Sequence, residues 1–165
     1  TLLRTLAGLA RPLSGSVHVN GVSIHELADT DWFPRVGYVP QDPWLGHGSV
    51  REALARGTDA TDADCRNALA AVGLGDVSLE AAIDDLGRGV SIGQRRRLAL
   101  ARYRLRRCEL LLLDEPTAAV DAESEARILE LLELWRAEGA IIVAVAHRPA
   151  LVGAAQQVVH LGGAQ

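Results

Sequence analysis

Four consecutive leucines, Leu110 to Leu113, run directly into two adjacent carboxylates, Asp114 and Glu115. A run this apolar is typical of a strand buried on both faces, as at the centre of a parallel sheet. The two acids then lie at the carboxyl end of that strand, where open α/β sheets place their ligands. One carboxylate at such an edge can hold a metal ion while the next polarises a water molecule. The segment therefore predicts an α/β fold with a functional site at one edge of its sheet.

The composition of the chain fits one globular domain with a sizeable core. Of its 165 residues, 48% are apolar but only 4% aromatic, so Leu, Val and Ala must fill the interior. The net charge of -4 argues against a general nucleic-acid binder. All 17 basic residues are Arg. Because no apolar run approaches the roughly 20 residues that span a bilayer, membrane association would need another domain or another chain.

Hydrophobic periodicity predicts strands that alternate with helices along the chain. The expected strands are 15–19, 36–39, 110–113, 140–146 and 156–161. The expected helices are 1–9, 49–54, 61–72, 91–105, 122–136 and a short one after Pro149. This alternation implies a parallel sheet built of right-handed crossovers. The stretch 49–72 and the loop 83–89 carry no strand signal, and we interpret about 49–105 as a helical subdomain inserted into a single domain, 1–165.

Three further polar side chains stand at positions suited to chemistry. Gln41 follows the strand 36–39, and its amide can face a metal ion and water. His147 follows the strand 140–146, where an imidazole can hydrogen-bond a phosphate. Ser91 opens an Arg-rich helix, whose first N–H groups can bind an anion. Taken singly, each could instead be a turn residue, a surface histidine or a helix cap.

The order of these motifs along the chain resembles that of the nucleotide-binding domain of ABC transporters. Residues 90–94, Val-Ser-Ile-Gly-Gln, take the place of the signature sequence, and Leu110–Glu115 that of the Walker B strand. Tyr38–Leu45 resembles the Q-loop, Ala118–Asp121 the D-loop, and His147 the switch histidine. The resemblance covers essentially the whole chain. It implies a P-loop NTPase-type parallel sheet, with a helical subdomain that carries the signature motif.

The resemblance also implies that ATP and Mg²⁺ bind at the sheet edge. Asp114 would support the Mg²⁺ shell, together with the amide of Gln41. Glu115 would be the general base for the water that attacks the γ-phosphate. His147 would hold nucleotide, water and base together. Asp121 would help to join two such domains in a dimer, and it can equally cap the helix that follows.

The signature sequence departs from the family pattern at one position. Ser91, Gly93 and Gln94 would bind the γ-phosphate of ATP held by the opposite domain. Ile92 stands where the family has its first glycine, and a β-branched side chain hinders close approach of the backbone. We expect weakened rather than abolished binding there. An intact Glu115 beside an altered signature favours a heterodimer with a second nucleotide-binding domain.

The P-loop of the family, Gly-x-x-x-x-Gly-Lys-Ser, has no counterpart in the chain, which contains no Lys. The opening residues resemble those that follow that lysine. Thr1 would then be the last residue of the motif, near the α-phosphate. We therefore expect the sequence to be truncated at its N-terminus, just after the Walker A lysine. The alternative that stays open is a parent protein that has lost its nucleotide site.

Three segments resemble exporters in particular: 48–54, Leu86–Gly89 and Arg97–Arg102. The last two of these segments are also similar to bacterial heterodimeric exporters, including the cysteine/glutathione exporters of cytochrome bd assembly. The resemblance implies an ATPase coupled to a transmembrane domain at the cytoplasmic face of the bacterial inner membrane. Two alternatives remain open at this point. One is a soluble ABC ATPase of translation or DNA repair, and the other is a module that binds nucleotide and clamps without turnover.

The arginines of the helix 91–105 and just beyond it could also indicate nucleic-acid binding. Helical spacing distributes them around the helix, and no aromatic platform accompanies them beyond Tyr103. We therefore expect a solvated helix face and contacts between subunits, and no nucleic-acid partner.

Overall fold

The computed structural model of the chain describes residues 2–84, 89–118 and 120–162. The helices are α1 (Leu2–Leu6), α2 (Asp29–Trp32), the 3₁₀ turn η1 (Phe33–Arg35), α3 (Val50–Ala55), α4 (Asp62–Ala71), α5 (Ile92–Arg106), α6 (Ala122–Ala137) and α7 (Pro149–Ala154). The strands are β1 (His18–Val19), β2 (Val22–Ser23), β3 (Val36–Val39), β4 (Gly48–Ser49), β5 (Ala82–Ile83), β6 (Leu110–Asp114) and β7 (Ile141–Val145).

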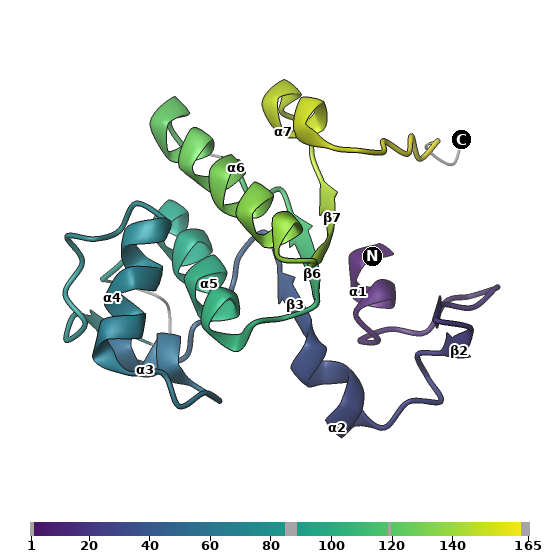
Figure 1. Ribbon diagram of the computed structural model, residues 1–165, viewed down its shortest axis with the longest axis horizontal. Helices are drawn as coiled ribbons and strands as arrows, with labels where there is room; N and C mark the ends of the chain where they lie inside the picture. Colours follow the sequence, from purple (N-terminus) through teal and green to yellow (C-terminus); the bar gives the residue numbers. More distant parts are fainter. Residues whose placement is uncertain (1, 85–88, 119, 163–165) are drawn as a thin grey trace.

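A parallel three-stranded sheet lies at the centre of the molecule. Its strand order is β3-β6-β7, so β6 has a neighbour on each side. Figure 1 shows this sheet between α3–α6 on one side and α1 with the β1–β2 hairpin on the other. Because β3, β6 and β7 all run in the same direction, their carboxyl ends meet at one edge. The predicted α/β fold with a parallel sheet is confirmed.

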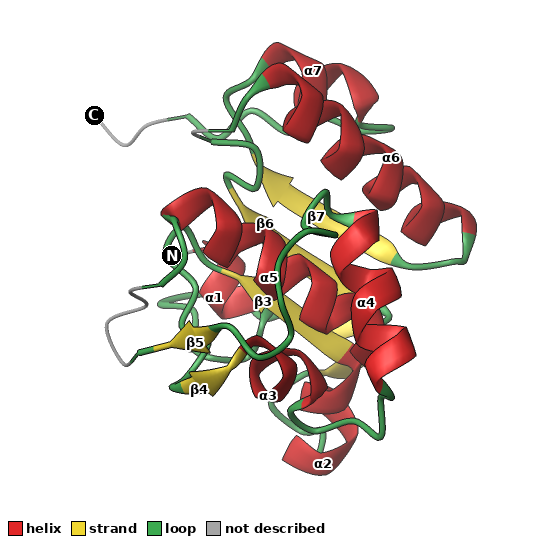
Figure 2. Ribbon diagram, turned by 90° about the vertical axis from the view of Figure 1, so that its left-hand side faces the viewer, coloured by secondary structure: helices red, strands yellow, loops and turns green. Residues whose placement is uncertain are grey.

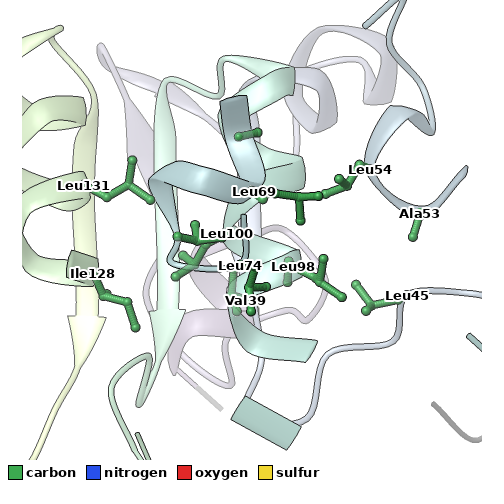
Figure 3. Packing of buried hydrophobic residues seen from close by; sticks show 14 of the residues in the cluster. Val39, Leu45, Ala53, Leu54, Leu69, Leu74, Leu98, Leu100, Ile128 and Leu131 are labelled. Carbon is green, nitrogen blue, oxygen red and sulfur yellow. The ribbon is translucent and has the colours of Figure 1, made fainter. Parts of the chain in front are cut away.

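The central strand β6 is buried on both faces, as its leucine run predicts. Leu111 and Leu113 pack into a larger cluster on the side of α3–α6, and Leu112 into a smaller cluster that includes Trp32. All three leucines are at most 1% exposed. Figure 3 shows part of the larger cluster, where leucines of α5 meet side chains of α3, α4 and α6. Burial on both faces fixes the position of the strand, and with it that of the two acids at its end.

Most of the predicted elements are present with small shifts at their ends. Strand β3 coincides with the predicted strand 36–39, and β6 extends the prediction 110–113 by one residue. Helix α5 begins directly after Ser91, whose side chain caps it. Helix α1 and strand β1 are shorter than predicted. These differences follow from fraying at element ends, which hydrophobic periodicity does not locate.

The strand predicted at 156–161 is wrong. Residues 156–162 form no regular element, and Val158, Val159 and Leu161 are 46%, 69% and 66% exposed. The β-branched composition favours an extended chain, but a strand also needs a neighbour that accepts its backbone hydrogen bonds. Within the described residues this segment pairs with no strand. Composition alone therefore could not decide whether residues 156–161 form a strand.

The prediction that the region around Ile83 lacks a strand is also wrong. Residues Gly48–Ser49 pair antiparallel with Ala82–Ile83, and the Val50 N–H donates to the Ala81 carbonyl at 2.9 Å. A ladder of two residues is too short to show an alternating pattern in the sequence. This small sheet joins the start of α3 to the segment that leads toward α5.

Among the described residues, no helix is long and apolar enough to cross a membrane.

Candidate functional site

The carboxyl edge of the central sheet collects three of the predicted site residues. In the ladder, Val39 of β3 lies beside Leu113 of β6, and Asp114 lies beside Val145 of β7. The three strands, which run side by side in Figure 2, therefore end at nearly the same level. The residues that follow them are Gln41, Glu115 and His147, so the fold itself brings these side chains to one place.

The Glu115 carboxylate lies between the other two side chains. The Gln41 amide Nε2 donates to Glu115 Oε2 at 3.2 Å. The His147 Nε2 lies 3.4 Å from Glu115 Oε1. The Glu115 side chain is 28% exposed, whereas that of His147 is 79% exposed. One carboxylate oxygen therefore faces an amide and the other an imidazole that remains open to a ligand from solvent.

The backbone of Glu115 has an unusual conformation, with φ at +50°. A non-glycine residue in this left-handed region costs about 1 kcal/mol, and such residues gather at functional sites. The Glu115 N–H nevertheless donates to the Val145 carbonyl at 3.0 Å, and the Ala118 N–H donates back to the Glu115 carbonyl at 3.0 Å. These two hydrogen bonds hold the turn at the point where the chain leaves β6.

Asp114 ends β6 and is half-buried beside Glu115. Burial and, secondarily, the Asp114 carboxylate raise the pKa of the Tyr38 phenol, which places the two side chains in one electrostatic environment. Among the described residues, no group of three His, Cys, Asp or Glu side chains could by itself hold a metal ion.

The signature residues form the N-terminus of α5. The Ser91 hydroxyl accepts from the Gln94 N–H at 3.1 Å, and the Gln94 side-chain oxygen accepts from the Ser91 N–H at 2.7 Å. This capping box fixes the start of the helix, and Gly93 lies within its first turn. Ile92 is 52% exposed, so its side chain projects from the helix end. Within the described ranges, the hydrogen bonds of Ser91 and Gln94 stay within this helix start and do not reach the Gln41–Glu115–His147 group.

Asp121 is the N-cap of α6. Its carboxylate accepts from the Ser124 N–H at 2.8 Å and from the Ser124 hydroxyl at 2.9 Å. These hydrogen bonds stabilise the charged form and lower the pKa of Asp121, the backbone bond having the larger effect. The structural half of the expectation for Asp121 is thus confirmed. Its role between two domains stays a prediction.

Two of the sequence predictions fall on residues outside the described ranges. These are Thr1, expected near the α-phosphate, and residues 86–88 of the exporter-like segment.

The interpretation of the arginine run as a solvated helix face is wrong. Arg96 is only 6% exposed and donates to two loop carbonyls, those of Gln41 and Ala118. Arg97 donates to the Gly73 carbonyl and to the Ser124 hydroxyl. Arginines spaced around a helix can bond inward as well as outward, and no pattern in the sequence separates these two cases.

Arg148 is a further residue that the sequence did not single out. Its Nη1 donates to the carbonyls of Thr117 and Val120 at 3.0 and 3.2 Å. The same nitrogen lies 3.1 Å from the Glu125 carboxylate. Arg148 directly follows His147 in the sequence. Its hydrogen bonds therefore connect this part of the chain to the segment between Glu115 and Asp121.

Replacing Arg148 with Ala is expected to lower the free energy of unfolding by about 2 kcal/mol. The Glu125 side chain, 14% exposed, would lose its cation, and two loop carbonyls would lose a donor. Urea denaturation of the full natural protein measures the effect. In the double variant Arg148→Ala, Glu125→Gln, which leaves no unpaired carboxylate, we expect roughly half of the loss to be recovered. An unchanged midpoint for Arg148→Ala would contradict the ion pair.

Comparisons with known proteins decide the family. Residues 1–118, more than half of the chain, match the sequence profile described as ABC transporter. This chain belongs to the ABC transporter family. Its members couple the hydrolysis of ATP to transport, and the nucleotide-binding cassette is the part that this chain represents. The order of motifs and the parallel sheet agree with that membership.

Individual ABC proteins are similar over 80% or more of the chain. One, from Haemophilus influenzae, is the glutathione/L-cysteine transport system ATP-binding/permease protein CydD, 39% identical over 80% of this chain and 23% of that protein. Another is the ABC-type transmembrane transporter verA of Clonostachys rogersoniana, 38% identical over 99% of this chain and 14% of that protein. A solved bacterial Atm1-family ABC exporter with ATP bound matches with a TM-score of 0.82 and 26% identity, over 92% of this chain and 27% of that one. The chain thus spans about a quarter or less of the length of these relatives.

Proposed function

We propose that this chain is the ATP-hydrolysing part of an exporter, with Glu115 as the general base. The observation that carries the proposal is the Glu115 carboxylate between the Gln41 amide and the His147 imidazole at the carboxyl edge of the sheet. A carboxylate held at a sheet edge can accept a proton from an attacking water. The exposed imidazole of His147 is free to hydrogen-bond a γ-phosphate, and the Gln41 amide fixes the direction of the carboxylate.

Mg²⁺ fits the residues present at this edge. Carboxylate and amide oxygens are the donors that Mg²⁺ prefers, and it completes its octahedron with water and substrate phosphates. Asp114 and the side-chain oxygen of Gln41 would hold the ion. When bound, Mg²⁺ neutralises charge on the phosphates during transfer. The chain itself supplies the base and its orientation.

We assign Ser91, Gly93 and Gln94 to the nucleotide of a second nucleotide-binding domain, and Asp121 to the contact between the two domains. The capped N-terminus of α5 offers backbone N–H groups and a positive dipole end, which favour an anion. We assign Thr1 to the nucleotide that this chain itself would bind, near its α-phosphate. The helical subdomain would extend over about 49–105.

The exposed side chain of Ile92 supports a heterodimer. It projects from the helix N-terminus at the place where a phosphate would approach the backbone. The nucleotide of the partner domain would therefore bind weakly at this signature and turn over slowly. Glu115 would work with a normal signature supplied by the partner. Two unequal sites follow from this arrangement.

Replacing Ile92 with Gly is expected to raise turnover at the weak site about tenfold, the equivalent of one regained backbone hydrogen bond of about 1.4 kcal/mol. Steady-state ATP hydrolysis by the full natural protein, assembled with its partner domain, measures the change. The control variant Ile92→Ala keeps a Cβ atom and should gain less. If glycine gives no gain while α5 remains folded, Ile92 does not limit this site.

Transport itself can be tested in inside-out membrane vesicles that contain the full natural protein. The family membership and the exporter relatives favour a protein of the bacterial inner membrane, with this domain at its cytoplasmic face and a transmembrane domain attached. Because one relative is named for glutathione and L-cysteine transport, these two thiols are the first substrates to test. ATP-dependent accumulation that ADP does not support is the expected result. ATP hydrolysis without accumulation of either thiol would exclude this substrate class.

A further inference from the structure

Arg96, in the second turn of α5, joins two segments that the candidate site needs. Its side chain is only 6% exposed. The guanidinium Nε donates to the backbone carbonyl of Gln41 at 2.7 Å, and Nη1 donates to the backbone carbonyl of Ala118. These carbonyls belong to the loop after β3 and to the loop after β6. One rigid, planar group therefore spans the two loops.

The two anchored loops are the ones whose side chains meet. The Gln41 amide reaches Glu115, and the Ala118 N–H donates to the Glu115 carbonyl at 3.0 Å. Arg96 thus holds the backbone of the residue that donates to the Glu115 carboxylate. It also holds the turn that keeps Glu115 in its left-handed conformation. The contacts of Gln41 and of Ala118 with Glu115 are therefore both supported by one side chain of α5, the helix that begins with the signature residues.

The partners of Arg96 indicate that it sets geometry. Within the described ranges Arg96 forms no ion pair, unlike its neighbour Arg95, which lies 3.0 Å from the Asp42 carboxylate. A buried cation satisfied by neutral carbonyls alone contributes little net stability, since its desolvation opposes its hydrogen bonds. Two fixed N–H directions, however, define the separation of two carbonyls in a way that the single ammonium of a lysine cannot.

We propose that Arg96 is a positioning residue for ATP hydrolysis, which couples the signature helix to the Gln41–Glu115 pair by holding both loop backbones. The proposal rests on the proposed function. It adds a buried residue whose effect reaches the base through two backbone carbonyls. A displacement of the start of α5 would move the Gln41 amide and the Glu115 turn together.

The test compares Arg96→Lys and Arg96→Met with Arg104→Lys in the full natural protein, assembled with its partner domain. Arg104 is the matched control, because it lies on the same helix and pairs with the exposed Glu138. Both Arg96 variants should lower kcat at least tenfold, with the lysine variant less impaired, while KM for ATP changes less than threefold. Such a split indicates loss of an interaction that matters in the transition state and not in ground-state binding.

Each other outcome overturns the proposal. A kcat within twofold of wild type, or a raised KM with unchanged kcat, would show that Arg96 does not position the base. If both Arg96 variants fail to fold by circular dichroism while Arg104→Lys folds, the guanidinium serves stability. Failure of the proposed function looks different: Glu115→Gln would then retain wild-type turnover, whatever the Arg96 variants do.

Discussion

Replacing Glu115 with Gln is expected to lower ATP turnover by about a thousandfold while nucleotide binding persists. General-base catalysis typically contributes 10² to 10⁴ in rate, and an amide cannot accept the proton of the attacking water. The substitution preserves the size of the side chain. The backbone hydrogen bonds that join Glu115 to Val145 and to Ala118 do not involve the carboxylate, so the turn should be retained. The loss should therefore appear in kcat and only slightly in KM.

Steady-state measurement of kcat and KM for Mg-ATP hydrolysis by the full natural protein, with binding measured separately by calorimetry, checks this expectation. Glu109→Gln is a suitable control. Glu109 immediately precedes β6, at the end opposite to the site, and its pairing with Arg35 is exposed. An exposed ion pair contributes little, so this variant should hydrolyse ATP as wild type does. Wild-type turnover by Glu115→Gln would remove Glu115 from the role of base. ATP binding without turnover in both wild type and variant would indicate a nucleotide clamp.

The site edge was predictable because strong local signals coincide there. The leucine run defines β6 without ambiguity, and the polar residues that follow β3, β6 and β7 fall at one edge once the strands are parallel. The hydrogen bond between Gln41 and Glu115 is then a consequence of register. What the sequence does not encode locally is the left-handed backbone of Glu115, which depends on the bonds to Val145 and Ala118.

The errors share a physical cause, because in each case the outcome depends on a distant partner. The segment 156–161 has the composition of a strand but no ladder partner among the described residues. In contrast, β4 and β5 pair with each other although more than thirty residues separate them and neither has a clear strand pattern. Arg96 looks like any surface arginine until the carbonyls of two loops are seen beside it. Periodicity measures a preference for burial or exposure and cannot supply the identity of the neighbour.

The strand that carries the site should also be the most sensitive to loss of packing. Replacing Leu112 with Ala is expected to lower the free energy of unfolding by about 3 kcal/mol, within the range for a fully buried leucine. Leu112 is 0% exposed and packs in the smaller cluster with Trp32, Leu3 and Val36. The cavity would open beneath β6, two residues before Asp114, where the surrounding helices leave little freedom to collapse.

Leu110 provides the internal control, since it lies on the same face of β6 two residues earlier and is only partly buried. Leu110→Ala should cost about 1 kcal/mol, because less apolar surface leaves the core. Urea titration followed by tryptophan emission measures both, and Trp32, which donates to the Ala7 carbonyl at 3.0 Å, reports on this cluster directly. Equal losses for the two variants would contradict the deeper burial of Leu112 on this face of β6. A larger loss at Leu112 would mean that the packing which locates Asp114 and Glu115 also sustains the fold.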